Sequence, residues 1–308
     1  MVGYKKHKNL TQLDFAIAGG LSGFITRSLC QPLDVLKIRF QLQVEPISNK
    51  SHSKYYSVIQ AVNVIFHEEG IKAFWKGHVP AQWLSVTYGT VQFWSFEVLS
   101  KKAQHYYNSS NAPVVNFCCG SIAGCTATLV SFPFDVIRTR LVAQSEQKKL
   151  YKGVWHSFQD MVTKEGFPVL FRGLLVTIGQ VGPHSGIQFM CYKVFDDICK
   201  RVIGSDSTSF SSSLVAGSLA GLCAKTCIYP FDLAKKRLQI QGFENARTVF
   251  GKHFQCSGLT DCLVKIYQNE GVLGFFKGLC PSLIKASLTT ALHFSTYEMV
   301  CRFLVSLK

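Results

Sequence analysis

Three ten-residue stretches of the sequence combine a proline, an acid and two bases in a fixed order. They begin at Pro32, Pro133 and Pro230, and in each the acid follows two residues after the proline and bases follow five and seven residues after it. A proline inside a helix kinks it, and residues three apart share one helical face. If three kinked helices meet at one level, each acid can bind a base of the next helix. We interpret these stretches as a gate closed by a ring of ion pairs.

A second group of polar side chains recurs at four-residue spacing, counted back from three aromatic residues, Phe96, Tyr192 and Tyr297. The rows are Leu84, Tyr88 and Gln92; Gln180, His184 and Gln188; and Lys285, Thr289 and His293. Residues four apart lie on the same face of a helix, and every row member except the leucine carries a polar group. We therefore expect these faces to surround a water-filled interior. For either histidine alone, a structural hydrogen bond explains the residue as well as a ligand contact does.

Three cations stand inside otherwise apolar stretches. Arg27 and Lys225 lie five residues before the first and third prolines, where the second copy has Thr128, and Lys285 belongs to one of the rows above. A cation within an apolar span is costly and normally faces a polar pathway. We expect Arg27, Lys225 and Lys285 to bind phosphate groups; the alternative is that they snorkel to an interface.

The composition favours a membrane protein with an anionic partner. The 308 residues are 47% hydrophobic and only 17% charged, yet the formal charge is +15. Such a surplus suits anionic lipid headgroups and an anionic ligand. The twelve cysteines are scattered without paired CxxC clusters, which argues against a zinc site and for core residues in a reducing compartment. The first residues contain no signal-peptide hydrophobic region, so we expect any targeting information to be internal.

The motifs recur at intervals of about 100 residues, which indicates an internal repeat. Each repeat has two apolar stretches near the ~20 residues needed to span a bilayer. The predicted first spans are 12–42, 112–143 and 209–240, and the predicted second spans are 78–104, 174–201 and 279–305. Between the two spans of each repeat we expect a short amphipathic helix, at 57–68, 154–164 and 257–269. Polar linkers between repeats are expected at 101–112 and 202–213. The prediction is an all-α membrane protein, one domain over 1–308 with repeats 12–105, 112–202 and 209–305.

With an acid-glycine pair and an aromatic-basic-glycine triplet after each proline stretch, the chain resembles the mitochondrial carrier family over nearly its whole length. The resemblance implies six tilted transmembrane helices in three pseudo-threefold repeats, three short matrix helices, a multi-pass location in the mitochondrial inner membrane, a monomer, and alternating access to one central site. It implies a transporter rather than an enzyme, with no cofactor, no metal and no nucleic acid bound. A basic RNA-binding or scaffold protein is the rival from another class, and extraction by high salt or carbonate would favour it.

The resemblance also implies a gate on the matrix side. The implied pairs are Asp34 with Arg138, Asp135 with Lys235, and Asp232 with Lys37, braced by Gln41 and Gln239. The second repeat has Val142 at the brace position, so we expect two braces rather than three. The alternative is that these charges are solvated at helix ends.

On the cytoplasmic side, the family often carries the pattern [FY]-[DE]-x-x-[KR] on its second helices. Two of the basic positions of that pattern are missing here, and we expect a weak lock. The residues left to form it are Glu97, Lys193, Asp196 and Glu298.

The aromatic-basic-glycine triplets resemble the feet with which the family binds cardiolipin. They are Trp75, Lys76 and Gly77; Phe171, Arg172 and Gly173; and Phe276, Lys277 and Gly278. Backbone amides beside a base suit a phosphate headgroup. The alternative is an interfacial aromatic-basic anchor.

Three cations and no acid among the predicted interior positions favour a polyanionic substrate. Gln180 and Val181 depart from the glycine-aliphatic pair that nucleotide carriers commonly have at this contact position, and the arginine of dicarboxylate carriers is absent. The stretches 74–82, 89–97 and 235–247 resemble a branch of the family that imports thiamine pyrophosphate, and the resemblance implies import in exchange for nucleotides. The runner-up is a carrier of adenine nucleotides or of another nucleotide-like cofactor.

That resemblance suggests roles for the uncharged members of the rows. Gln92, Gln180 or Gln188 could hydrogen-bond the aminopyrimidine edge, and Tyr88 could lie against the thiazolium as a cation–π partner. For Tyr88, an ordinary place in a packed helix is the alternative.

Overall fold

The computed structural model describes residues 11–45, 47, 53–106, 112–144, 149–203, 210–243 and 255–306. These residues form nine α-helices and no strand. The six long ones are α1 (Gln12–Leu42), α3 (His78–Tyr106), α4 (Ala112–Ala143), α6 (Leu174–Ile203), α7 (Phe210–Gln239) and α9 (Leu279–Ser306). The three short ones are α2 (Val58–Glu69), α5 (Val154–Glu165) and α8 (Leu259–Gly274), of which the first two are followed by 3-10 turns η1 (Ile71–Trp75) and η3 (Phe167–Phe171).

The predicted elements are present, with different ends. Helix α3 continues to Tyr106 and α6 to Ile203, so part of each expected polar linker is helical. Helix α8 runs on to Gly274 across a break at Gly271, where the backbone leaves the helical region. The linkers are shorter than expected because polar residues at a helix end continue the helix where the backbone can be solvated.

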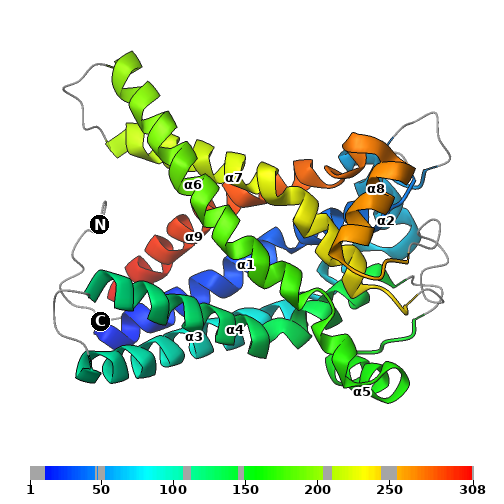
Figure 1. The fold of residues 1–308 in the computed structure, drawn as a ribbon, viewed down its shortest axis with the longest axis horizontal. Helices are drawn as coiled ribbons and strands as arrows, with labels where there is room; N and C mark the ends of the chain where they lie inside the picture. Colours follow the sequence, from blue (N-terminus) through cyan, green and yellow to red (C-terminus); the bar gives the residue numbers. More distant parts are fainter. Residues whose placement is uncertain are drawn as a thin grey trace.

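The long helices converge at one end of the molecule and spread apart at the other (Figure 1). The second long helix of each repeat packs along the first long helix of the next, giving the neighbour pairs α3–α4, α6–α7 and α9–α1. The short helices α2, α5 and α8 gather where the long helices converge (Figure 1). We call this end, which lies beyond Pro32, Pro133 and Pro230 along their helices, the proline end, and the other the open end.

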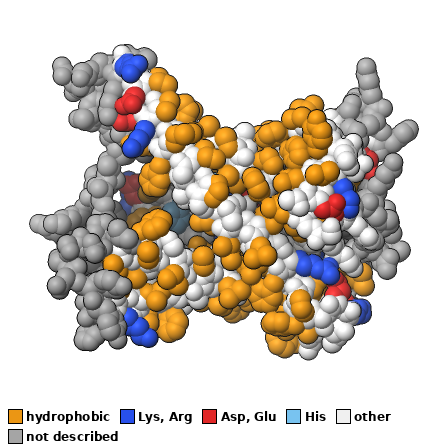
Figure 2. Space-filling model, in the orientation of Figure 1, with side chains coloured by type: hydrophobic (Ala, Val, Ile, Leu, Met, Phe, Trp, Pro, Cys, Tyr) orange, Lys and Arg blue, Asp and Glu red, His pale blue; other side chains and the backbone are white. Residues whose placement is uncertain are grey.

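An apolar surface surrounds the middle of the molecule. In Figure 2 hydrophobic side chains cover the centre of the visible face, whereas charged ones gather towards its two ends. Large side chains such as Leu175, Phe93 and Phe294 are 84%, 77% and 69% exposed. Apolar exposure of this extent marks contact with lipid or another protein.

Hydropathy by itself finds fewer spans than the fold contains. Among the described residues, only 115–143 passes alone as a span, with mean hydropathy 1.5, and one bent helix pair, α8 with α9, passes together. The other long helices carry the interior polar rows and cations, which lower their average hydropathy. Interior polarity is what an aqueous pathway between helices requires.

Each proline stretch lies inside a long helix, as predicted. Pro32, Pro133 and Pro230 are internal to α1, α4 and α7. A helix of 31 residues is about 46 Å long at ~1.5 Å per residue, whereas the hydrocarbon core of a bilayer is ~30 Å thick. The helix therefore has to tilt, bend or project from the hydrocarbon, and the proline bend brings the last turns of α1, α4 and α7 together.

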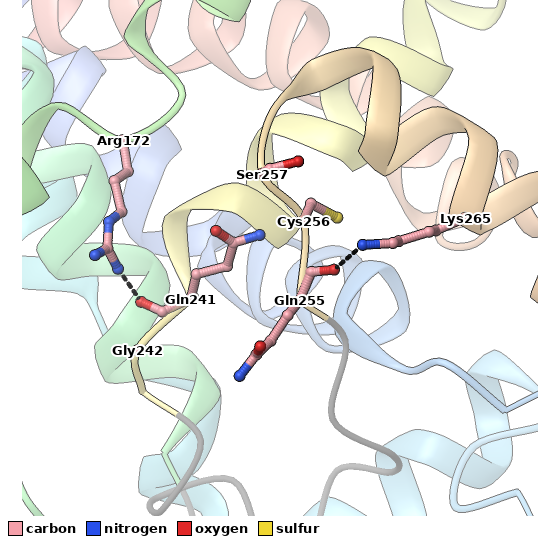
Figure 3. Close-up of a pocket in the computed structure, with 7 residues that line it drawn as sticks. All are labelled: Arg172, Gln241, Gly242, Gln255, Cys256, Ser257 and Lys265. Atoms are coloured by element: carbon pink, nitrogen blue, oxygen red, sulfur yellow. Dashed lines mark hydrogen bonds between the residues drawn. The ribbon is translucent and has the colours of Figure 1, made fainter.

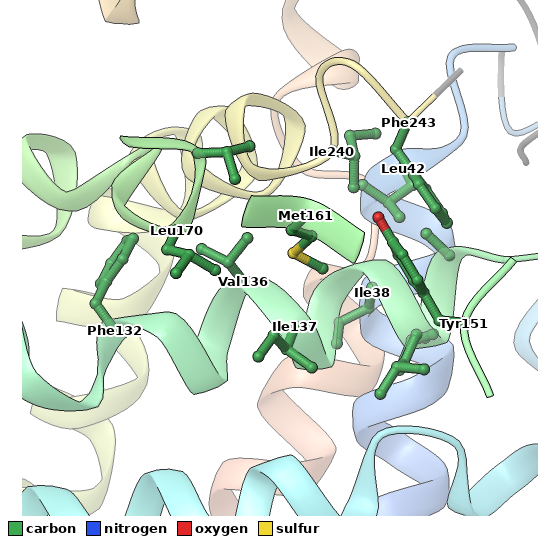
Figure 4. Close-up of a cluster of buried hydrophobic side chains, with 14 of the residues drawn as sticks. Ile38, Leu42, Phe132, Val136, Ile137, Tyr151, Met161, Leu170, Ile240 and Phe243 are labelled. Atoms are coloured by element: carbon green, nitrogen blue, oxygen red, sulfur yellow. The ribbon is translucent and has the colours of Figure 1, made fainter. Parts of the chain in front are cut away.

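The apolar core lies at the proline end, because the interior nearer the open end is polar. The main cluster joins α1, α4, α5, η3 and the residues after α7 (Figure 4). Within it, Tyr151 stacks on Phe243 with ring centroids 4.9 Å apart. This contact packs the second repeat against the third.

Buried ion pairs fix the short helices to the ends of the kinked helices. In each repeat the base seven residues after the proline binds the acid of the acid-glycine pair: Arg39 with Glu69, Arg140 with Glu165, and Arg237 with Glu270. Burial raises the pKa of Glu69, but the Arg39 guanidinium outweighs it and holds that pKa below its usual range. Removing one partner of such a pair leaves a buried charge and costs about 3–5 kcal/mol.

The glycine of each triplet permits a close approach between neighbouring repeats. Gly278 has φ +81°, and a Cβ there would lie 2.9 Å from both the Lys37 carbonyl oxygen and the Tyr229 hydroxyl. Gly77 meets Arg138 and Gly173 meets Lys235 in the same way. Each triplet thus docks against the backbone of a gate cation, which only glycine allows.

We predict that Gly278→Ala lowers the apparent melting temperature of the purified protein by several degrees. The alanine must adopt a left-handed backbone, at about 1–3 kcal/mol, and must also displace the Lys37 carbonyl or Tyr229. The matched control is Gly179→Ala, because Gly179 is inside α6 with no atom within 4 Å of its added Cβ. Equal melting temperatures for the two variants would show that the close approach is not needed.

Candidate functional site

Three ion pairs join the repeats in a ring at the proline end. Their N–O distances are 2.5 Å for Arg138 and Asp34, 2.8 Å for Lys235 and Asp135, and 3.2 Å for Lys37 and Asp232. These are the pairings implied by the sequence. All six groups are largely buried, and the ring connects α1 to α4, α4 to α7 and α7 to α1.

Each aspartate of the ring has at least one further partner, and the three differ. Asp34 also binds Lys285 at 2.6 Å. Asp135 also binds Lys236 at 2.9 Å, and the Gln180 amide donates to Asp232 at 3.2 Å. Lys236 was missed by the sequence reasoning. Its signal was the doubled base in the third stretch, which the other two copies lack.

One of the two expected braces forms. The Gln239 amide donates to Asp135 at 2.9 Å and accepts from Lys236 at 3.0 Å. Gln41 is fully buried, and its side-chain amide makes no hydrogen bond to Lys37 or Asp232 in the described part of the chain. The expected brace at Gln41 is therefore not formed in this structure. Asp232 instead receives Lys37 on one carboxylate oxygen and Gln180 on the other.

Cavities lie on the open-end side of this ring. The largest of three, about 550 Å³, is lined by Arg27, Lys285, Thr289 and His293 among others. A second, of about 360 Å³, shares Arg27 and adds Tyr88, Thr128 and Leu84. The third, of about 300 Å³, is lined by Gln180, His184, Lys225 and Asp232. All three predicted cations therefore line cavities beside the gate.

Two glutamines expected at the site lie elsewhere. Gln92 and Gln188 are not among the residues that line these three cavities. Each is one turn beyond a cavity residue, Tyr88 or His184, towards the open end where the helices spread apart. The four-residue rows continue past the cavities, so sequence spacing alone could not show where the lining stops.

The three cavity cations, Arg27, Lys225 and Lys285, differ in their protein partners. The Arg27 guanidinium donates to the Ala81 carbonyl at the start of α3, and Lys285 is paired with Asp34. Lys225 forms no ion pair with any residue that the structure describes. A polyanion entering the cavities would meet one uncommitted ammonium and two cations whose protein partners it could replace.

Positive charge exceeds negative charge around the site. The ring contributes three aspartates and the bases Lys37, Arg138, Lys235 and Lys236. The cavities add the cations Arg27, Lys225 and Lys285. Such a surplus in a concave, low-dielectric site concentrates anions. No group of three metal-ligating side chains occurs in the described part of the chain.

At the open end, two of the three acids expected to form a lock pair with bases on their own helices. Glu97 pairs with Lys101 at 2.7 Å and Glu298 with Arg302 at 2.6 Å, each one turn along its own helix and well exposed. Each base is one residue further along than the family pattern predicts, and residues four apart on a helix face each other.

The triplet bases have protein partners as well. Lys76 binds Glu69 at 2.5 Å, Arg172 binds Glu165 at 3.2 Å, and Lys277 binds Glu270. Lys277 is only 3% exposed and also donates to three backbone carbonyls after α1. The Lys277 ammonium is therefore enclosed by protein acceptors, so at this triplet only the backbone amides are left as the predicted lipid contact.

Arg172 differs, because its side chain is 38% exposed. It lines a surface cavity of about 590 Å³ with Gln241, Gly242 and the segment preceding α8 (Figure 3). Lys265 lines the opposite side, donates to the Gln255 carbonyl at 2.9 Å and pairs with Asp261, one turn back on α8, at 2.8 Å. This cavity thus brings together two bases and the N-terminus of a helix.

Comparison with known proteins shows the family to which the chain belongs. Residues 8–107, 109–202 and 206–308 each match the family described as mitochondrial carrier protein. The chain belongs to the mitochondrial carrier family. It is a multi-pass transporter of the mitochondrial inner membrane, not an enzyme.

Several similar relatives carry the name of a thiamine pyrophosphate or thiamine diphosphate carrier. The chain is 46% identical over 309 residues to a mitochondrial thiamine pyrophosphate carrier of Homo sapiens, covering 98% of this chain and 96% of the relative. It is 34% identical to a mitochondrial thiamine pyrophosphate carrier 1 of Aspergillus terreus, covering 97% and 94%. It is also 34% identical to a mitochondrial thiamine diphosphate carrier 1 of Zea mays, covering 92% of each.

The differences between the ring aspartates give a test of the ion pairs. We predict that the exchanged pair Lys37→Asp with Asp232→Lys recovers more transport than Asp34→Lys with Arg138→Asp. Asp34 has a second cation, Lys285, which would face the new lysine, whereas Gln180 beside Asp232 has a free amide oxygen to accept from a lysine.

The measurement is substrate uptake by liposomes containing each variant, with the four single reversals as controls. Each single reversal should lose most of the activity, because it places like charges together. Equal recovery by the two exchanged pairs would contradict the role of Lys285 at Asp34.

Proposed function

We propose that this protein imports thiamine pyrophosphate into the mitochondrial matrix in exchange for nucleotides, by alternating access to one site. The observation that carries the proposal is the position of Arg27, Lys225 and Lys285 in cavities directly beside a closed ring of ion pairs. The names of the relatives, which cover nearly the whole chain, point to the same substrate. The cavities are enclosed by helices of one chain, so we propose a monomer as the transport unit.

The diphosphate binds between Arg27 and Lys285, which line the same cavity. Lys285 then exchanges Asp34 for a phosphate oxygen, and Arg27 exchanges the Ala81 carbonyl. Charge-assisted hydrogen bonds to phosphate are the stronger kind, so the substrate can compete for both groups. Lys225, in the neighbouring cavity, supplies the third positive charge.

The ring end of the substrate binds among uncharged groups. Gln180 and His184 line the cavity that holds Lys225, and they offer hydrogen bonds to an aminopyrimidine edge. Tyr88 lies in another cavity, on the far side of Arg27. Tyr88 and Gln180 therefore act on different parts of the ligand, with Tyr88 as the cation–π partner of the thiazolium.

The gate chemistry suits a reversible barrier. Desolvation offsets much of the attraction within a buried ion pair, and a substrate shifts a conformational equilibrium by its differential affinity for the two states. Taking Lys285 from Asp34 and Gln180 from Asp232 weakens two of the three linkages. The ring therefore closes the matrix side in the empty state and opens after substrate has bound.

Removal of one cavity cation tests the site. We predict that Lys285→Ala lowers the initial rate of labelled thiamine pyrophosphate uptake by liposomes at least tenfold, since one charge-assisted contact is worth roughly 1.5–3 kcal/mol. The matched control is Lys101→Ala, which removes an exposed lysine from the same kind of helix and should leave uptake unchanged. Gel-filtration profiles establish that both variants are folded.

Substrate competition separates the candidates. Unlabelled thiamine pyrophosphate should inhibit uptake strongly and unphosphorylated thiamine weakly, because thiamine lacks the groups that the cations bind. Transport of ADP without any transport of thiamine pyrophosphate would refute the substrate assignment and favour the alternative, an adenine-nucleotide carrier. Equal inhibition by thiamine would refute the phosphate roles of the cations.

We also propose that cardiolipin binds through a phosphate in the cavity between Arg172 and Lys265 (Figure 3). Cardiolipin should raise the apparent melting temperature of the detergent-purified protein, and Lys265→Ala should remove much of that rise. The control is Lys164→Ala, because Lys164 is also exposed and pairs with an acid, Asp160, one turn away on a short helix. This variant should retain the rise in melting temperature. An unchanged cardiolipin effect in Lys265→Ala would contradict this site.

A further inference from the structure

Two cysteines of different repeats lie in contact between α6 and α7. The Sγ atoms of Cys191 and Cys223 are 3.4 Å apart. Cys191 is buried and Cys223 half-buried, and both are free thiols, as is Cys227 one turn further along α7. Nothing in the proposed transport site uses these groups.

The same position in the other repeats holds hydroxyl residues. The residue before each row-anchoring aromatic is Ser95, Cys191 or Thr296. Thr296 of α9 lies 3.2 Å from Thr26 of α1, oxygen to oxygen. The boundary between the third and first repeats is thus bridged by two hydroxyls, and the boundary between the second and third by two thiols. Only the thiol pair can become a covalent link.

The helices are closely packed beside the thiols. Cys191 precedes Tyr192, whose ring lies against Gly217 of α7, with 3.9 Å between the ring and a Cβ built on that glycine. A disulfide requires sulfurs about 2.05 Å apart. The sulfurs must therefore approach by about 1.4 Å, which side-chain rotation can supply without separating the helices.

We propose that Cys191 and Cys223 form a reversible disulfide in the presence of hydrogen peroxide, and that this link stops transport. One sulfur attacks the peroxide O–O bond, giving a sulfenic acid and water. The second thiol then displaces the sulfenic oxygen, which leaves as a second water while the S–S bond forms. The two sulfurs together lose two electrons to one peroxide, and both thiol protons end in water.

The link would hold the second repeat to the third on the open-end side of the cavities. Transport by alternating access needs the repeats to move relative to one another, so the tether arrests it. Peroxide suits a buried pair because it is small and uncharged. The arrest rests on the proposed function, but formation of the bond does not.

The experiment treats the purified protein in liposomes with hydrogen peroxide, removes the excess with catalase and blocks the remaining thiols with N-ethylmaleimide. Mass spectrometry of a digest made without reductant should show a peptide pair linked through Cys191 and Cys223. Uptake of thiamine pyrophosphate should fall at least fivefold and return on addition of dithiothreitol. The apparent melting temperature should rise in the oxidised protein, because the link constrains the unfolded chain.

Variants at the three neighbouring thiols decide the assignment. Cys191→Ser and Cys223→Ser should keep normal uptake and lose both the linked peptide and the sensitivity to peroxide. Cys227→Ser should behave as the parent protein. The proposal is overturned by absence of the linked peptide, by linkage without loss of uptake, or by equal peroxide sensitivity in Cys191→Ser. If reduced protein shows no uptake of thiamine pyrophosphate, the proposed function fails, and the linked peptide with its melting shift still tests the disulfide.

Discussion

A carboxylate in the interior of a membrane protein has to be surrounded by donors, because neither lipid nor packed side chains can replace its hydration. Asp34, Asp135 and Asp232 each meet this requirement with a base from another repeat and at least one further donor. Since no repeat can satisfy its own aspartate, the three hairpins have to assemble around one axis. The closed floor of the cavity is a consequence of that assembly.

The further donors make the three repeats unequal, and this inequality connects the floor to the cavity. Asp135 is held by Lys236 and Gln239, which belong to the gate alone. Asp34 and Asp232 are held in part by Lys285 and Gln180, which also line cavities. The further partners of Asp34 and Asp232 are therefore within reach of a bound ligand, whereas on the third side Asp135 and its ring base Lys235 themselves line the Tyr88 cavity. The repeated positions define the geometry, while the positions that differ between repeats define what the site can bind.

The sequence predicted those features that follow from position along a helix. Prolines, acids and bases at fixed spacing were enough to infer three kinked helices and their ring, and the rows with four-residue spacing located Lys285, Gln180 and His184 on the interior. Features that depend on which side chains come within hydrogen-bond distance could not be predicted this way. Gln41 makes no hydrogen bond to Asp232, which receives Lys37 and Gln180 instead, and the Lys277 ammonium is enclosed by Glu270 and three carbonyls.

Predictions that assumed equivalent positions in the three repeats failed where the repeats differ in sequence. Lys101 and Arg302 lie one residue from the expected position, so an alignment to the family pattern skipped both, although each faces its acid across one helical turn. Lys236 was overlooked for a similar reason, since it has no counterpart in the other two repeats.

The close contact between each triplet glycine and the backbone of a gate cation has a mechanical consequence. Where main chain meets main chain without a side chain between, the helices can rotate about the contact but have little room to slide or to part. The three contacts therefore fix the distance between neighbouring repeats at the level of the triplets. A side chain at any of these glycines would wedge two repeats apart, so the spacing of the bundle at the proline end depends on three positions that carry only a hydrogen atom.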